Sequence, residues 1–400
     1  MLVLRLAPNP LHHGAVAIAR SLGRMGARVY AVVEDGSTPL ARSRYCAGTV
    51  RLPLPPADAL EAVRLLTDFA ETIGERPLLI PIDDVGAVFV ADHAQALTAA
   101  YVFPQQPDGL ARRLSSKLEM QRICIEQGIP TPAIRVPGND EEVAAAAADL
   151  RYPVMVKRIT EWAPAEQHGP RMGRATTPDE LVARFAEMRD RDAPNLLFQE
   201  YVPGGVDWMF NGYFDAASRC LFAATGFKVR QYPVGTGPTS LGECRHNDGV
   251  RACATDLLTR VGYRGIVDAG MRFDPRDGEY KVLDVNPRIG STFRLFTGRG
   301  GIDVARALYL DFAGEPVESD EPADGRRWLV ENYDLAAAAG YARSGRLSAT
   351  QWIRSLRGVR EVAWTARDDL GPARSAAAAS VRSALRRVLA TTRTGKGVRR

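Results

Sequence analysis

The residues best suited to chemistry lie in one short segment, Val282–Gly290, at the end of an apolar run. Asp284 and Asn286 are two positions apart, so in a β-strand both side chains leave the same face. Pro287 ends the strand, and Arg288 follows it directly. Two oxygen ligands beside a guanidinium suit a magnesium-bound polyphosphate. The alternative is an ordinary strand-to-turn junction with a surface Asp and a turn-forming Asn-Pro pair.

Further candidates for anion and base recognition lie upstream. Lys117 starts a predicted helix, and Lys157 ends an apolar strand, where a lysine usually reaches an anion or a buried carboxylate. The polar segment Gln167–Arg174 suits backbone amides and arginines folded over phosphates, although no P-loop pattern is present. Gln199 and the strand edge around it are suited to reading a purine, and Asp207, past a Pro-Gly turn, to binding ribose hydroxyls. An ordinary edge strand and turn is the alternative there.

The composition excludes several other classes of protein. The chain has 400 residues, 46% of them hydrophobic, which is enough for two or three structural units. No apolar run reaches membrane-spanning length, and we expect no signal peptide. The five cysteines are scattered without a C-x-x-C pair, which indicates reduced thiols in a cytoplasmic protein rather than zinc or disulfides.

The net charge of +5 comes from the end of the chain. Residues 371–400 hold eight Lys or Arg and no Asp or Glu, so residues 1–370 carry a net charge of 5 − 8 = −3. We therefore expect no specific nucleic-acid binding by the main body. A tail that associates with membranes or nucleic acids stays open as an alternative to a solubilising extension.

The elements that must position these residues form an α/β protein. Leu2–Leu6, Gly14–Gly26 and Arg28–Val33 predict a β-α-β start, as in Rossmann-like sheets, but no G-x-G-x-x-G turn supports a dinucleotide site. Pro77–Asp83 predicts another strand, and capping of the next helix is the expected role of the Asp83-Asp84 pair.

Alternating strand and helix patterns continue to about residue 310. Predicted helices are Leu110–Gln127, Asp140–Leu150, Thr177–Arg189, Val250–Val261 and Gly301–Leu310. Predicted strands are Tyr152–Arg158, Leu196–Val202, Val206–Phe214, Cys220–Val229, Gly265–Phe273 and Tyr280–Asn286. We expect domains at 1–105 and 106–314, with a lid subdomain at about 153–204, a mostly helical extension at 315–370, and a basic, partly disordered tail at 371–400.

The order of these motifs resembles the ATP-grasp superfamily, especially the carbamoyl-phosphate-synthase-like carboxylate–amine ligases, over roughly residues 1–310. The motifs that carry the resemblance are Arg20–Gly26, Ser43–Tyr45, Gly128–Pro132, Pro153–Lys157, Gln199–Gly204, Arg230–Pro233 and Asp284–Arg288. The resemblance implies an N-terminal Rossmann-like pre-ATP-grasp domain followed by a two-subdomain ATP-grasp domain.

The resemblance also implies a role for each candidate residue. Lys117 and Lys157 would hold the α- and β-phosphates of ATP, and Arg288 would stabilise the transferring γ-phosphoryl group or the acyl phosphate. The remaining implied roles are adenine recognition by Gln199 with the backbone of Glu200, Tyr201 and Val202, ribose binding by Asp207, and Mg²⁺ binding, with Mn²⁺ as an alternative, by Asp284 and Asn286.

The chain departs from the family pattern at Gly270. Family members usually carry a carboxylate at this position, on the strand before the hairpin. Asp268 lies two residues earlier, on the same strand face, and would reach the metal through a shifted register or a water. If it does not, one metal ligand is missing. Asp284 also replaces the more usual Glu.

The expected function is therefore an ATP-grasp ligase that activates a carboxylate as an acyl phosphate and joins it to an amine. The alternative is a catalytically weak or inactive nucleotide-binding homologue, because of Gly270. Lys228 or Arg294 would bind a substrate carboxylate, or else each is a surface charge. Expected partners are small-molecule substrates and, as an open question, a second copy of the chain.

Overall fold

The computed structural model describes residues 1–9, 11–160, 172–190, 195–235, 237–318 and 321–394, with side chains of the final helix described to residue 382. Most of the predicted phosphate loop Gln167–Arg174 therefore lies outside the described residues. The described residues form three sheets, of four, seven and four strands. The mixed α/β class predicted from the sequence is confirmed.

The N-terminal part is a parallel sheet of order β3-β2-β1-β4. Its strands are β1 (Leu2–Leu4), β2 (Val29–Val33), β3 (Cys46–Arg51) and β4 (Leu79–Pro81), and its helices are α1 (His13–Gly23), α2 (Ala59–Ile73), α3 (Asp84–Asp92) and α4 (Ala94–Leu97). Asp83 caps α3, as predicted: Oδ1 accepts from the Gly86 N–H at 2.6 Å. Its Oδ2 accepts from the Leu6 and Ala7 N–H groups at 2.9 and 3.0 Å, which ties α3 to the end of β1.

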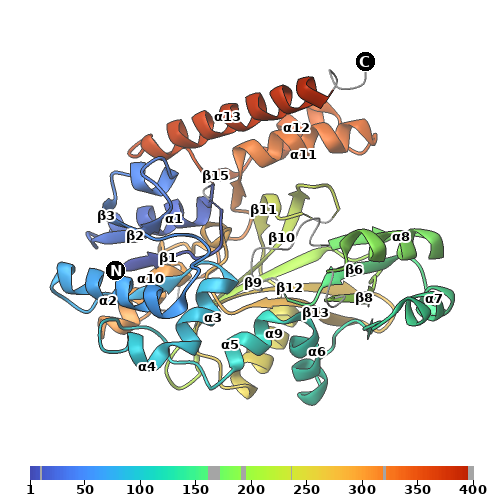
Figure 1. Ribbon diagram of the computed structural model, residues 1–400, viewed down its shortest axis with the longest axis horizontal. Coiled ribbons are helices and arrows are strands. Elements are labelled where there is room, and N and C mark those ends of the chain that lie inside the picture. Colours follow the sequence, from blue (N-terminus) through green and yellow to red (C-terminus); the bar gives the residue numbers. More distant parts are fainter. Residues whose placement is uncertain (10, 161–171, 191–194, 236, 319–320, 395–400) are drawn as a thin grey trace.

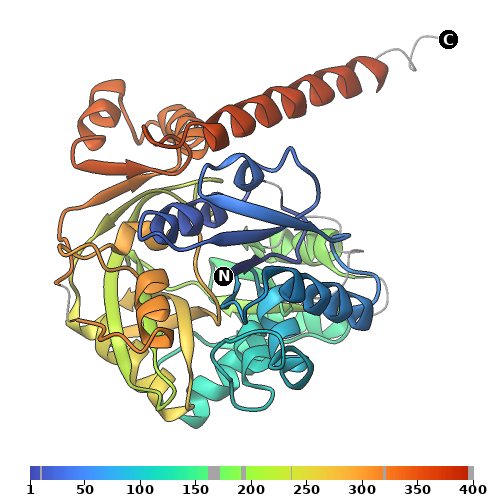
Figure 2. The same ribbon diagram turned by 90° about the vertical axis from the view of Figure 1, so that its left-hand side faces the viewer.

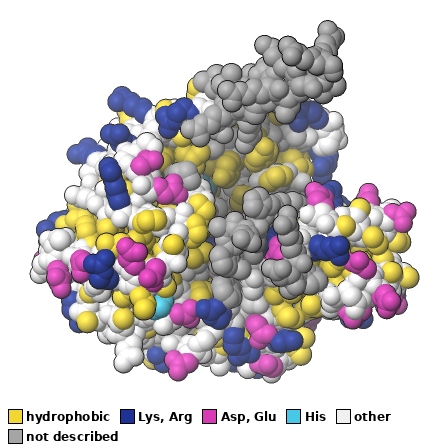
Figure 3. All heavy atoms as spheres, viewed as in Figure 1, with side chains coloured by type: hydrophobic (Ala, Val, Ile, Leu, Met, Phe, Trp, Pro, Cys, Tyr) yellow, Lys and Arg dark blue, Asp and Glu magenta, His cyan; other side chains and the backbone are white. Residues whose placement is uncertain are grey.

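A small antiparallel sheet of order β5-β8-β6-β7 forms the lobe on the right of Figure 1, which we call the lid. Its strands are β5 (Ile134–Arg135), β6 (Val154–Arg158), β7 (Met172–Ala175) and β8 (Leu196–Glu200), covered by α7 (Asp140–Asp149) and α8 (Pro178–Met188). Apolar side chains of the two helices, such as Val143 of α7 and Phe185 of α8, bury against the alternating inner face of the strands. Acidic and basic side chains are interspersed over the outer surface of this lobe (Figure 3).

The central sheet has the order β13-β12-β9-β10-β11-β14-β15. Its strands are β9 (Asp207–Phe214), β10 (Cys220–Gln231), β11 (Thr239–Cys244), β12 (Gly265–Asp274), β13 (Glu279–Asn286), β14 (Arg327–Leu329) and β15 (Val359–Val362). The helices around it are α5 (Leu110–Ser115), α6 (Lys117–Glu126), α9 (Asp248–Arg260) and α10 (Val304–Phe312). The region 315–370, expected to be mostly helical, thus also adds strands β14 and β15 to the central sheet.

The prediction of one helix over Leu110–Gln127 is wrong. Ser116 has an extended backbone (φ −88°, ψ 120°) that separates α5 from α6. Its hydroxyl accepts from the Glu119 N–H at 3.4 Å and caps α6, so Lys117 becomes the first residue of the second helix.

The C-terminal region contains α11 (Glu331–Arg343), α12 (Ala349–Ser355) and α13 (Gly371–Thr394), which lie together at the top of Figure 1. Figure 2 shows the far end of α13 extending away from the body of the molecule. The basic tail is helical over its described residues, 371–394. No helix among the described residues is long and apolar enough to cross a membrane.

Buried ion pairs hold this C-terminal region in place. Arg20 of α1 donates through Nε to Asp369 at 2.9 Å, and Asp369 also accepts from the Ser43 hydroxyl and the Arg44 N–H. Arg230 of β10 pairs with Asp334 of α11 at 2.8 and 2.9 Å. Three of the motifs that carry the family resemblance therefore serve to dock residues beyond 330.

Candidate active site

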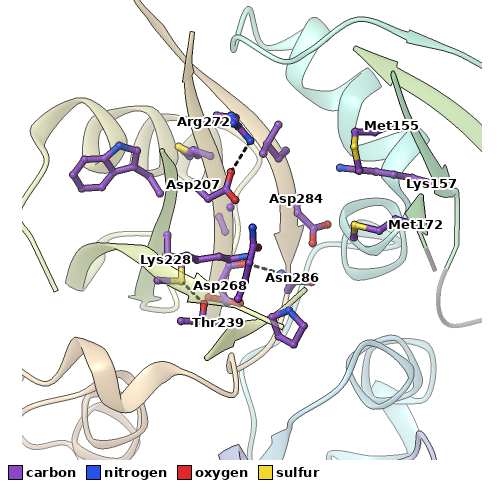
Figure 4. Close-up of a pocket in the computed structure, with 18 of the residues that line it drawn as sticks. Met155, Lys157, Met172, Asp207, Lys228, Thr239, Asp268, Arg272, Asp284 and Asn286 are labelled. Carbon is purple, nitrogen blue, oxygen red and sulfur yellow. Dashed lines mark hydrogen bonds and ion pairs between the residues drawn. The ribbon is translucent and has the colours of Figure 1, made fainter. Parts of the chain in front are cut away.

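A cavity of about 300 Å³ lies between the lid and one face of the central sheet (Figure 4). We call it the first cavity. Every predicted site residue except Lys117 and Arg294 lines it. These residues are Lys157, Gln199, Glu200, Tyr201, Val202, Asp207, Lys228, Asp268, Asp284, Asn286 and Arg288. Residues from separate parts of the sequence thus converge on one space, whereas their individual roles remain predictions. Arg294 is neither a surface charge nor part of this cavity, because it is buried and pairs with Asp303 and Glu361.

The register of the central sheet arranges the floor of this cavity. Asp268 of β12 pairs with Asn286 of β13, and Gly270 pairs directly with Asp284. The register shifts just beyond this pair, so that Leu283 is an extra residue on β13. Because side chains alternate along each strand, the predicted metal residues and Asp268 share the face that looks toward the lid.

Asp284 lies between two lysines from different elements. Lys117, at the start of α6, is only 8% exposed. Its Nζ lies 3.4 Å from Asp284 Oδ1. Figure 4 shows Lys157 projecting from the lid toward Asp284. Burial acts to raise the pKa of Asp284, but the charges of Lys117, Lys157 and Arg288 together hold it below its usual value. The carboxylate is therefore ionised and surrounded by cations that also suit phosphate oxygens.

Arg288 joins the central sheet to the N-terminal part. Its Nε donates to Asp84 Oδ1 at 3.1 Å, and its Nη1 lies 3.7 Å from Asp268 Oδ2. Burial acts to lower the pKa of Arg288, but Asp84, Asp268 and Asp284 raise it overall. The guanidinium is thus held charged at one end of the first cavity.

Asp268 lies at this Arg288 end, with Lys228 close enough to act on its charge. Figure 4 shows it grouped with Lys228 and away from the carboxylate of Asp284. Burial raises the pKa of Asp268, and the charges of Arg288 and Lys228 only partly oppose that effect. Its carboxyl group packs against Gly290, where an added Cβ would meet Asp268 Cγ at 2.6 Å.

The opposite end of the cavity holds the predicted nucleotide residues in a network of their own. Asp207 pairs with Arg272 at 3.1 Å, and Arg272 also donates to the Tyr201 hydroxyl at 3.1 Å. Glu200 pairs with Arg276 at 2.6 Å. Gln199 is almost fully buried at 4% exposure, in the middle of the lid sheet. These contacts fix the connection between the lid and the central sheet, from Glu200 to Asp207, which we call the hinge.

Sequence reasoning missed several residues that line the first cavity. Arg272 is two positions after Gly270, so the period of strand β12 already places both on one face. Met155 and Met172 line the lid side, where their flexible thioethers suit a flat aromatic ring. The spacing of Met155 and Met172 in the sequence does not predict that they line one cavity, because β6 and β7 become neighbours only when the lid sheet forms.

The donor set fits a metal that arrives with a polyphosphate. Asp284 and Asn286 offer two oxygen ligands on one face, and Mg²⁺ commonly binds one or two carboxylates together with substrate phosphates. Over the described part of the chain, no group of three or more His, Cys, Asp or Glu side chains forms a self-sufficient metal cage. The residues therefore fit a magnesium–nucleotide complex better than an isolated ion.

Comparison with known proteins agrees with this geometry. The chain is 23% identical to a D-aspartate ligase of Enterococcus faecium over 265 residues, which is 62% of each protein. It is 24% identical to the C-terminal section of the carbamoyl phosphate synthase large chain of Methanopyrus kandleri over 244 residues, 57% of this chain and 44% of that one. The biotin carboxylase domain of Hydrogenobacter thermophilus 2-oxoglutarate carboxylase, solved with MgADP, superposes with a TM-score of 0.60 at 15% identity, covering 80% of this chain and 70% of that one.

No family model matches the chain. It spans about half to three fifths of the length of these two curated relatives. Three observations nevertheless point to the same fold: the order of the motifs, the lid over a central sheet and these similarities. The chain has the ATP-grasp fold and is a homologue of D-aspartate ligase and of sections of carbamoyl-phosphate synthase.

Proposed function

We propose that the protein is an ATP-dependent carboxylate–amine ligase that releases ADP. The observation that carries the proposal is the convergence in one cavity of a lid lysine, Lys157, with Asp284, Asn286 and Arg288 of the floor. Phosphoryl transfer depends mainly on positioning and charge neutralisation, and this arrangement offers both.

In this proposal ATP lies along the first cavity from the hinge to Arg288. Gln199 and the backbone of Glu200–Val202 contact the adenine at the hinge, and Asp207, held by Arg272, contacts the ribose. Lys117 and Lys157 neutralise the phosphates. Asp284 and Asn286 would hold Mg²⁺, which supplies charge neutralisation between neighbouring phosphate oxygens.

The reaction then has two steps. A substrate carboxylate oxygen attacks the γ-phosphorus, and the bond from the γ-phosphorus to the β-phosphate oxygen breaks. The products of this step are ADP and an acyl phosphate that lies beside Arg288. The lone pair of an amine attacks the acyl carbon, inorganic phosphate leaves, and the amine loses a proton to give the amide. Arg288 stabilises the phosphoryl charge in both steps from a fixed position, because Asp84 and Asp268 hold it.

We further propose that an amino acid is one of the substrates. The Arg288 end of the first cavity presents a cation, Lys228 of β10, and an anion, Asp268 of β12, on the same floor. This pair matches the carboxylate and ammonium groups of a zwitterion. The similarity to D-aspartate ligase supports the same substrate class. In this assignment Asp268 orients the amine and is not a metal ligand.

The competing function is nucleotide binding without turnover. Gly270 favours it, because the residue directly opposite Asp284 offers no carboxylate. An assay of ADP release separates the two functions. The full chain is incubated with Mg-ATP and a panel of amino acids, including D- and L-aspartate, in all carboxylate–amine pairs.

The ligase proposal predicts ADP release that requires both a carboxylate and an amine. Asp284→Asn should reduce it at least about 100-fold, because the charged carboxylate that would hold Mg²⁺ is lost. The matched control Asp256→Asn changes an exposed carboxylate on α9 and should leave the rate unchanged. Tight ATP binding with no ADP release from any pair would instead support the non-catalytic function.

A further inference from the structure

A second cavity, of about 350 Å³, lies where the N-terminal part meets the central sheet. Its walls come from β4, helix α3, the connection Phe103–Gly109 and the start of β12. Among the described residues, Arg288 is the one lining residue that it shares with the first cavity. The second cavity is therefore a separate space beside the catalytic one.

The walls of the second cavity combine apolar side chains with an almost equal polar surface. Large buried side chains such as Ile80, Phe103 and Leu308 form the sides, and small residues such as Ala87 and Ala91 of α3 leave the space between them. Binding sites for small molecules typically have this size and lining, with a few polar groups that set orientation. The apolar part of this lining suits the apolar body of a ligand, and the polar part suits a polar group on the same molecule.

One polar side chain in the wall, Arg264, has a buried donor without a protein acceptor. Arg264 donates through Nη1 to the Gln105 carbonyl at 3.1 Å, while its Nε is buried without a partner. No carboxylate in the described part of the chain forms an ion pair with Arg264. Of the wall carboxylates, Asp92 pairs with Arg112, and Asp108 is exposed. A guanidinium at the edge of an apolar space suits a carboxylate on an apolar body.

We propose that the second cavity binds a small apolar or aromatic monocarboxylate, with its body between α3 and β12 and its carboxylate at Arg264. The occupant contacts α3 and the segment Pro287–Ile289 together. These are the two elements that the Asp84–Arg288 pair connects at 3.1 Å. The occupant therefore changes the position of Arg288 and, with it, the rate of the ligase. This coupling rests on the proposed function, whereas the binding does not.

Calorimetric titration of the full chain tests the binding directly. The probes are 4-phenylbutyrate and its neutral counterpart 4-phenylbutyramide, which have the same apolar body. We expect the carboxylate to bind at least about tenfold more tightly than the amide. Arg264→Gln should abolish that difference, and Ala91→Phe, which fills the space from α3, should weaken both probes at least about tenfold. Ala144→Phe, on the exposed face of α7, is the matched control and should change neither.

Absence of saturable binding of either probe up to ~10 mM would overturn the proposal, as would equal binding to the Ala91→Phe protein. Equal affinity for the carboxylate and the amide would overturn the role of Arg264. Coupling is measured as the change in ADP release at saturating probe, or as the change in ATP affinity if the protein does not release ADP. A bound probe that alters neither would overturn the coupling alone. Probe binding without any ligase activity would contradict only the proposed function.

Discussion

Asp268 lies in close contact with two residues of the segment that follows β13. Its carboxylate lies 3.7 Å from Arg288 and packs against Gly290. An ideal Cβ at Gly290 would meet both carboxylate oxygens of Asp268 at 2.8 and 2.9 Å. The glycine is therefore required by a close side-chain approach, and its replacement should displace the carboxylate of Asp268.

We expect Gly290→Ala to lower kcat/KM for the amine substrate by roughly 10- to 100-fold, because the carboxylate that orients the amine must move. The KM for ATP should stay nearly constant, since the residues proposed to contact adenine and ribose lie at the opposite end of the cavity. Steady-state kinetics with each substrate varied in turn measures both quantities. Gly138→Ala, at an exposed position, is the control. An equal increase in the KM for the amine and the KM for ATP would contradict the assignment of Asp268.

Gly270 leaves room for a side chain. The nearest atom to an added Cβ is Asp284 Cβ at 3.9 Å, which is ordinary van der Waals contact. Gly270→Glu should therefore fold normally and place a second carboxylate opposite Asp284. We expect the Mg²⁺ concentration for half-maximal ADP release to fall roughly tenfold, because an additional charged ligand strengthens the site. Unchanged Mg²⁺ dependence would mean that this position does not face the metal.

The sequence was sufficient to predict which residues converge, but not which of them are neighbours. Asp284, Asn286 and Arg288 could be grouped because one strand and its turn carry them. The position of Asp268 depends on the β12–β13 register and on Leu283, the extra residue. A register shift of one residue exchanges the two faces of a strand, and the sequence pattern here does not specify it.

At the scale of elements, short strands and helix ends were the hardest to predict. Strand β14 has three residues and β15 has four, and each is stabilised by pairing within the central sheet rather than by its own pattern. The break at Ser116 was hidden because both flanking segments have helical composition. By contrast, the cap at Asp83 was predicted correctly, since an Asp before an apolar helix has a local physical reason.

Asp83→Ala should lower the free energy of unfolding by about 2–3 kcal/mol, since its carboxylate accepts from three backbone N–H groups. Denaturant unfolding measures the change. Asp58→Ala removes the cap of α2, where the carboxylate contacts only the first turn of its own helix, and should cost about 1 kcal/mol. Equal losses in the two variants would contradict the role of Asp83 in tying α3 to β1.

At the scale of the whole molecule, the C-terminal region is part of the folded body. His13 of α1 is 5% exposed and lies among Trp328, Tyr333 and Trp364, with ring centroids 5.3, 6.0 and 5.9 Å away. These aromatic residues come from β14, the start of α11 and the segment after β15. Contacts between residues more than 300 positions apart leave no trace in local sequence patterns, so this docking could not be predicted.

Burial lowers the pKa of His13 to about 4. The unfolded chain, with a pKa near 6.5, therefore takes up a proton between pH 6.5 and 4 that the folded protein does not. Stability from His13 is present above pH 6.5 and is lost as the pH falls toward 4, by about 3 kcal/mol in total. His13→Phe should reduce this pH dependence of denaturant unfolding by that amount. Identical pH profiles for the two proteins would contradict the assignment.

The central claim, formation of an acyl phosphate in the first cavity, has a direct isotopic test. The carboxylate substrate found in the ADP-release assay is labelled with ¹⁸O on both oxygens, and the inorganic phosphate released with the amide is analysed by mass spectrometry. Attack of a carboxylate oxygen on the γ-phosphorus transfers one ¹⁸O to each phosphate that is released. We predict one ¹⁸O per phosphate at full turnover. Phosphate without ¹⁸O, formed at the same rate as the amide, would contradict the account.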